Sequence, residues 1–115
     1  MTDELDEAFS RIEMLAARRA LPGVTRSTIE GRPALTVAGH GFVSLREPAV
    51  MALHCPSEQK ALLMDISPAI YFETAEDIGH GEVLIHLDVI SDEELSLRLD
   101  DGWRHRAPAD PLVRR

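Results

Sequence analysis

The spacing of apolar positions changes along the chain, and each spacing predicts a different element. Residues 5–16 place apolar side chains three and four positions apart, which predicts a helix that ends before Pro22-Gly23. From residue 24 to residue 54 the period becomes two, which predicts strands at 24–29, 35–38, 42–46 and 50–54. Gly39-His40-Gly41 separates two of these runs and indicates a hairpin turn.

The second half of the chain predicts two more helices and at least one more strand. A helix is expected over about 57–64 and a half-buried strand over 83–87, while the apolar segment 70–72 fits either a strand or a turn of helix. Ser91 and Glu94 have the spacing of a capping box, and Ile90 and Leu95 that of a hydrophobic staple. This order predicts an α+β fold, an antiparallel sheet with helices on one face.

Length and charge narrow the class of protein. The 115 residues suffice for one domain, expected over 1–115 with a frayed tail from about residue 109. The net charge of -8 argues against a duplex nucleic-acid binder, which usually presents a basic surface. No apolar run approaches the roughly 20 residues that span a bilayer, and the N-terminus is acidic. We therefore expect a cytoplasmic protein without a membrane partner.

The sequence contains no recognisable catalytic or metal-binding set. Cys55 is the only cysteine, and in a strand it would point away from its neighbour His54, so we interpret it as a small buried hydrophobe. The histidines lack the spacing of helix ligands, and the glycines lack the context of a phosphate-binding loop. We expect no catalytic residues, no metal and no cofactor. An enzyme would need a pocket that joins His54, His86 and a carboxylate.

Arginine supplies the positive charge, since Lys60 is the only lysine. Arginine is the better bidentate phosphate ligand, and the C-terminal stretch holds several arginines against the single acid Asp110. Four arginines near predicted turns and at the end of the last helix are the candidate DNA contacts: Arg32, Arg46, Arg104 and Arg106.

The order of several short segments resembles a known family. These segments are Ala20-Leu21-Pro22-Gly23-Val24, Gly31-Arg32-Pro33-Ala34-Leu35, Phe42-Val43-Ser44-Leu45, Pro56-Ser57-Glu58-Gln59-Lys60, Ala69-Ile70-Tyr71-Phe72-Glu73-Thr74, Val83-Leu84-Ile85-His86-Leu87 and Trp103-Arg104-His105-Arg106-Ala107-Pro108. Together they resemble the MmcQ/YjbR-like family of small bacterial proteins. The resemblance implies a fold similar to type III secretion chaperones, a curved antiparallel sheet backed by helices. It also implies the family's label of a DNA-binding protein with a double-wing arrangement.

The sequence therefore leaves two candidate functions. DNA binding follows from the family label, although this chain has Glu82 where family members often carry tryptophan and Ala109 where they often carry lysine. The alternative is a non-enzymatic protein-interaction module, chaperone-like or homodimeric, which binds a peptide along a sheet edge or pairs with itself.

Overall fold

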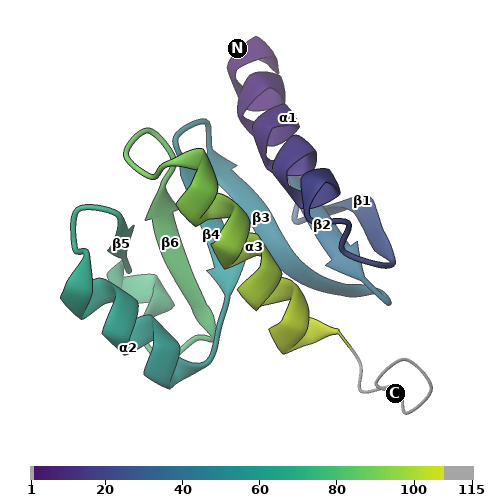
Figure 1. Ribbon diagram of the computed structural model, residues 1–115. Coiled ribbons are helices and arrows are strands. Elements are labelled where there is room, and N and C mark those ends of the chain that lie inside the picture. Colours follow the sequence, from purple (N-terminus) through teal and green to yellow (C-terminus); the bar gives the residue numbers. More distant parts are fainter. Residues whose placement is uncertain (1, 108–115) are drawn as a thin grey trace.

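The computed structural model describes residues 2–107, so the expected frayed tail from about residue 109 lies outside the described part. The elements follow the predicted order (Figure 1): α1 (Thr2–Arg18), β1 (Val24–Ile29), β2 (Arg32–Val37), β3 (His40–Glu47), β4 (Val50–His54), α2 (Ser57–Ile66), β5 (Tyr71–Phe72), the 3-10 helix η1 (Ala75–Asp77), β6 (Glu82–His86) and α3 (Asp92–Arg106). The ambiguous apolar segment thus forms a short strand, β5.

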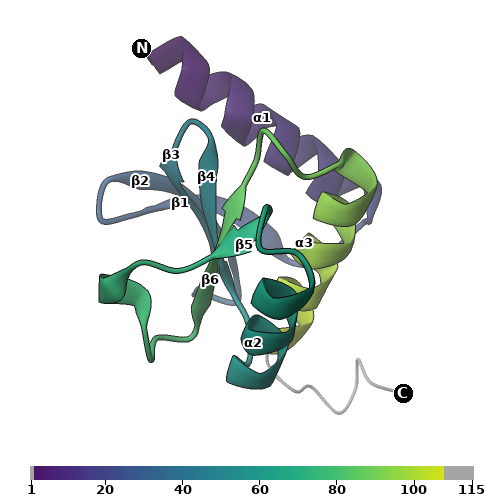
Figure 2. The same ribbon diagram turned by 90° about the vertical axis from the view of Figure 1, so that its left-hand side faces the viewer.

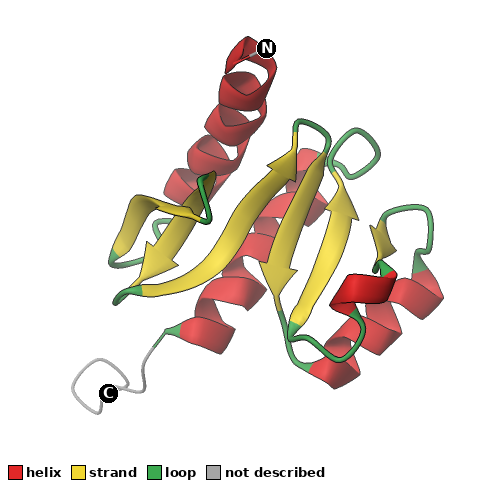
Figure 3. Cartoon of the chain, turned by 180° about the vertical axis from the view of Figure 1, so that it is seen from behind, coloured by secondary structure: helices red, strands yellow, loops and turns green. Residues whose placement is uncertain are grey.

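The six strands form one open sheet in the order β1-β2-β3-β4-β6-β5, and every neighbouring pair is antiparallel. Figure 3 shows this sheet from the side that the α-helices leave uncovered. The strands β1 and β5 are its two edges. The α+β prediction is confirmed.

The core lies between the sheet and the helices (Figure 2). The three α-helices lie on the same side of the sheet, and the short η1 lies on the other side. Helix α1 contributes Phe9, Ile12 and Leu15, and α3 contributes Leu95 and Leu99; each is at most 2% exposed. The predicted apolar stripe of the first helix is therefore its buried face.

The β2–β3 hairpin turns one residue earlier than expected. Val37 pairs with His40, so the turn consists of Ala38 and Gly39, which have φ values of 52° and 82°. Two successive positive φ values are typical of a type I′ turn, whose twist matches that of the flanking strands. His40 and Gly41 belong to β3 instead of the turn. Glu30 and Gly31 form the β1–β2 turn in the same way, with φ values of 53° and 78°.

Helix α3 begins as predicted but with half of the expected capping box. The Ser91 hydroxyl accepts a hydrogen bond from the backbone N–H of Glu94. The Glu94 carboxylate accepts from the Tyr71 hydroxyl, so it joins the helix to β5 rather than returning to Ser91. Ile90 and Leu95, the predicted staple, are both buried. Among the described residues, no helix has the length and apolar character needed to cross a membrane.

Candidate functional site

The four arginines predicted as DNA contacts lie in three parts of the fold. Arg32 is the first residue of β2, next to the β1–β2 turn, and Arg46 lies near the end of β3. Arg104 and Arg106 both lie in the last turn of α3. Only this last pair therefore shares an element.

Three of these arginines lie beside acids. Arg46 Nη2 is 3.0 Å from Glu82 Oε1 and 3.4 Å from Asp77 Oδ1, and the arginine side chain is only 26% exposed. Arg104 Nε is 2.9 Å from Asp100 Oδ1, although this side chain is 73% exposed. Arg32 lies 4.0 Å from Glu30. Much of the positive charge is therefore balanced locally, in keeping with the acidic composition.

The fourth arginine connects two elements. Arg106 Nε donates a hydrogen bond to the backbone carbonyl of Gly41 across 3.1 Å, which ties the end of α3 to the start of β3. This contact gives Arg106 a structural role independent of any ligand.

Two aspartates beside these arginines, Asp77 and Asp100, have lowered pKa values. Burial works to raise the pKa of Asp77, but hydrogen bonds from Thr74 and the charge of Arg46 outweigh it and lower the pKa. The pKa of Asp100 is lowered in the same manner, against the effect of burial, by hydrogen bonds from Arg104 and Arg19. Glu82 also belongs to the acids that contact Arg46.

The cysteine and the two histidines of interest lie in different surroundings. Cys55 is 1% exposed, and burial raises the pKa of its thiol to about 11, so the thiolate that a nucleophile needs is scarce near neutral pH. His54 lies 3.7 Å from Glu82, with its ring centroid 6.4 Å from that of His105. His86 instead stacks on Phe72, with ring centroids 4.2 Å apart. Over residues 2–107 no group of three or more acidic, histidine or cysteine side chains could hold a metal ion.

A hollow of about 450 Å³ is lined in part by Lys60, a buried lysine that makes several contacts. Lys60 is 6% exposed; its Nζ lies 2.7 Å from Glu73 Oε1 and donates to the carbonyl oxygens of Asp77 and His80. Two hydrogen bonds and one ion pair thus hold the ammonium group. Lys60 therefore secures the segment between β5 and β6 to α2.

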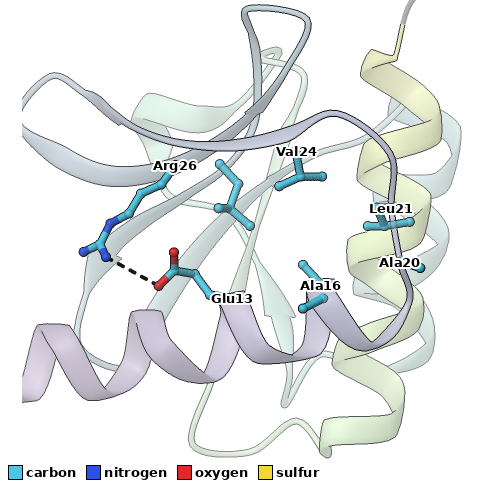
Figure 4. A pocket seen from close by; sticks show the side chains of 8 residues that line it. Glu13, Ala16, Ala20, Leu21, Val24 and Arg26 are labelled. Atoms are coloured by element: carbon cyan, nitrogen blue, oxygen red, sulfur yellow. Dashed lines mark ion pairs between the residues drawn. The ribbon is translucent and has the colours of Figure 1, made fainter.

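The feature that stands apart is a groove between α1 and β1, shown in Figure 4. Its volume is about 260 Å³. Its lining is mostly apolar: Ala16, Ala17, Ala20, Leu21, Val24 and Leu35, with Glu13 and Arg26 at one end. Small alanine side chains along one side of α1 leave the hollow next to the strand.

At the charged end of the groove, Glu13 of α1 and Arg26 of β1 form an ion pair but no hydrogen bond. Arg26 Nη1 lies 3.6 Å from Glu13 Oε1, which is longer than a hydrogen bond. The Arg26 guanidinium also lies over the Phe9 ring, 5.0 Å from its centroid. A ligand group can therefore approach the Glu13 carboxylate without breaking a hydrogen bond.

The groove runs along an open sheet edge. Ile29 and Arg32 flank a two-residue turn, so they form a hydrogen-bonded pair, and alternate residues of β1 direct their backbone groups toward β2. Val24, Arg26 and Thr28 consequently direct theirs away from the sheet. Because alternate residues share a face, the side chains of Val24 and Arg26 both lie on the groove side.

The sequence did not reveal this groove. Its walls come from a helix and a strand that each have an unremarkable pattern, and only packing brings Glu13 next to Arg26. The available signal was the run of alanines near the end of the first helix, followed by a strand with a single charged residue.

These features define a small α+β domain with an open antiparallel sheet, helices on one face and a free edge strand. The chain belongs to the YjbR family, whose model matches residues 19–105. The matched region contains β1 but not the α1 wall of the groove. No curated protein and no solved structure matches the chain. The expected similarity to type III secretion chaperones therefore stays a prediction.

Proposed function

We propose that this protein is a non-enzymatic interaction domain that binds an extended segment of a partner protein along β1. The observation that carries the proposal is the open edge of β1 beside an apolar groove. A partner strand would take main-chain hydrogen bonds from the edge and place alternate side chains in the groove.

The edge has few of the features that usually prevent strand addition. Natural sheets protect exposed edges with several charges, proline, bulges or a covering element. Strand β1 is six residues long, pairs with β2 in an unbroken register, and carries one charged side chain, Arg26. The other edge, β5, has only two residues. Strand β1 is therefore the better site for an added strand.

The experiment first selects peptides that bind the chain and then compares their affinities for the unchanged chain and for variants. Displayed random ten-residue segments are selected on the immobilised chain, and the enriched peptides are titrated by fluorescence anisotropy. We expect Thr28→Pro to weaken their binding on the order of tenfold, because it removes one outward N–H where proline is tolerated on an edge. Thr28→Val, which keeps the N–H, is the matched control and should bind normally.

A second variant tests the groove rather than the edge. Ala17 is exposed and lines the hollow, so Ala17→Tyr should fill it without disturbing the core. Binding of the enriched peptides should weaken here as well. The proposal fails if no peptide is enriched, or if Thr28→Pro and Ala17→Tyr bind as well as the unchanged chain.

DNA binding is the second candidate, and the last turn of α3 favours it. Arg104, His105 and Arg106 follow one another there, and Arg104 is largely exposed. An anisotropy titration with a short duplex at two salt concentrations tests it. Arg104→Ala should weaken binding and reduce by about 1 the slope of log K against the logarithm of the salt concentration. Arg18→Ala, an equal charge change on α1, should leave both the affinity and this slope unchanged. Absence of binding at low salt would exclude this candidate.

A further inference from the structure

We propose that the last turn of α3 is an acid-sensitive latch, in which protonation of His54 at mildly acidic pH releases residues 103–107 from the sheet. The latch consists of His54 at the end of β4, Glu82 opposite it on β6, and His105 and Arg106 of the helix. It goes beyond the proposed function, because it needs no ligand and its residues do not line the groove.

Helix α3 approaches the sheet where β4 ends. A Cβ on Gly102 would lie 3.5 Å from the His54 carbonyl oxygen, so the helix backbone passes close to this strand end. The ring centroids of His54 and His105 are 6.4 Å apart. Arg106 Nε donates to the Gly41 carbonyl oxygen across 3.1 Å, which holds the same turn to the start of β3. The last helical turn therefore lies beside the His54 imidazole.

A shared acid and two positive groups surround this imidazole. Glu82 is paired with His54 across β4 and β6, and its Oε2 lies 3.7 Å from His54 Nε2. The other oxygen of this carboxylate already lies 3.0 Å from Arg46. Arg106 and His105 both oppose a positive charge on His54. A proton on His54 would thus add a charge between two positive groups of the helix and a carboxylate that Arg46 already holds.

The remaining charged groups around this point form pairs of their own: Asp101 with Arg98, Lys60 with Glu73, and Asp77 with Arg46. The exposed His80 lines the same hollow as His105, and imidazoles gain positive charge as the pH falls. In the described part of the chain, Glu82 is therefore the carboxylate that meets His54.

The closed arrangement favours the neutral imidazole. Burial, and next the charge of Arg106, lowers the pKa of His54, while Glu82 acts in the opposite direction. When the turn moves away, the imidazole regains water and loses its positive neighbours, so its pKa returns toward about 6.5. The released turn therefore takes up the proton first, and a falling pH favours release. About one unit below this value, uptake of a single proton raises the released fraction at most about tenfold.

Release of the turn would also loosen the entry to β1. Trp103 belongs to the same turn, and its indole Nε1–H donates to the Pro22 carbonyl oxygen across 2.8 Å. Pro22 lies in the loop between α1 and β1, next to Leu21 of the groove. Acid would thus free the end of the groove near Leu21. This consequence rests on the proposed function, whereas the latch itself does not.

Amide hydrogen exchange on the full chain tests the latch. The Ala107 N–H donates to the Trp103 carbonyl across 2.7 Å, so its exchange reports the opening of this turn. We expect its protection, relative to the intrinsic exchange rate at each pH, to fall several-fold and at most about tenfold from about pH 7.5 to about pH 5.5. Local release exposes little surface, so this exchange should depend only weakly on low concentrations of urea.

Three substitutions assign the effect. His54→Gln removes the titrating group, so the fall in Ala107 protection should disappear. His105→Gln lies at an exposed position, where folding is little affected, and should make the fall smaller because one positive neighbour is lost. His40→Gln, at the exposed start of β3, is the matched control and should keep the full change.

The latch is refuted if Ala107 has the same protection at both pH values, or if His54→Gln keeps the fall. Exchange that rises with urea as steeply as global unfolding would refute it too. These rates are measured without any peptide, so they are independent of the selection. Enriched peptides that bind β1 in a chain without the acid response would keep the proposed function and remove the latch. An acid response in a chain that enriches no peptide would do the reverse.

Discussion

The indole of Trp103 donates its Nε1–H to the carbonyl oxygen of Pro22, 2.8 Å away and 81 positions earlier in the chain. This bond joins the last turn of α3 to the loop between α1 and β1. It fixes the direction in which the chain enters β1, and with it the opening of the groove near Leu21.

Replacing the indole tests this connection. Trp103→Phe keeps an aromatic ring but leaves the Pro22 carbonyl without its donor. We expect a loss of about 1 kcal/mol in the free energy of unfolding, the usual net value of one hydrogen bond. Urea denaturation followed by circular dichroism measures it. A variant as stable as the unchanged chain would show that water replaces the indole at no cost.

At Gly102, helix α3 packs closely against side chains of the sheet. A Cβ at this position would lie 2.7 Å from Leu53 Cδ1 and 3.4 Å from Phe42 Cδ2. Inside a helix, alanine stabilises the folded state by about 1 kcal/mol relative to glycine. Overpacking a core, however, destabilises the folded state by about 1–3 kcal/mol. We expect Gly102→Ala to destabilise the protein in urea denaturation.

The same clash predicts a coupling. Leu53→Ala alone should cost about 2–5 kcal/mol, because it leaves a cavity. It also removes the atom that Gly102→Ala would meet, so the second substitution should become neutral or stabilising in that background. Additive losses in the double variant would show that the helix does not rest on Leu53.

The sequence was sufficient for elements whose signals are local. Strands β1 and β4 have the predicted boundaries, and Ser91 caps α3 as its spacing indicated. The hairpin turn was misplaced by one residue, because Gly39 and Gly41 both fit a turn and only the pairing of Val37 with His40 decides between them. The predicted bond from the Glu94 side chain back to Ser91 was wrong, because this carboxylate accepts a hydrogen bond from Tyr71, which lies 23 positions away.

Non-local pairing also explains why the site was harder to predict. The sequence identified exposed-looking arginines, but it could not show that Arg46 meets Glu82 and Asp77, 36 and 31 positions away. The groove depends on the approach of α1 to β1, which side-chain packing determines. Edge position is a property of strand order, which depends on pairing between distant parts of the chain.

Tyr71 supplies a spectroscopic test of the contact between β5 and α3. Burial, together with the hydrogen bond to Glu94, raises the pKa of this phenol well above its usual value. Tyr71 is the only tyrosine, so absorbance near 295 nm follows it alone. We expect ionisation in the folded chain only above pH 10, and near pH 10 in the urea-unfolded chain.

The sign of this shift also gives a stability prediction at alkaline pH. Since the phenolate is favoured in the unfolded chain, stability should fall as the pH rises through about 10. Tyr71→Phe should remove that part of the decline while losing the hydrogen bond at neutral pH. Equal tyrosine midpoints in folded and unfolded chains would contradict the buried contact.

His54 gives a prediction for mildly acidic conditions. Burial, and next the positive charge of Arg106, lowers the pKa of this histidine, although Glu82 acts in the opposite direction. The unfolded chain therefore takes up the proton first. Stability should decline as the pH falls below about 6.5, the usual histidine value. His54→Gln should flatten the dependence of the unfolding free energy on pH between 7 and 5, whereas His40→Gln, at an exposed hairpin position, should not. If both variants keep the slope of the unchanged chain, the pKa of His54 is not lowered by burial in the folded protein.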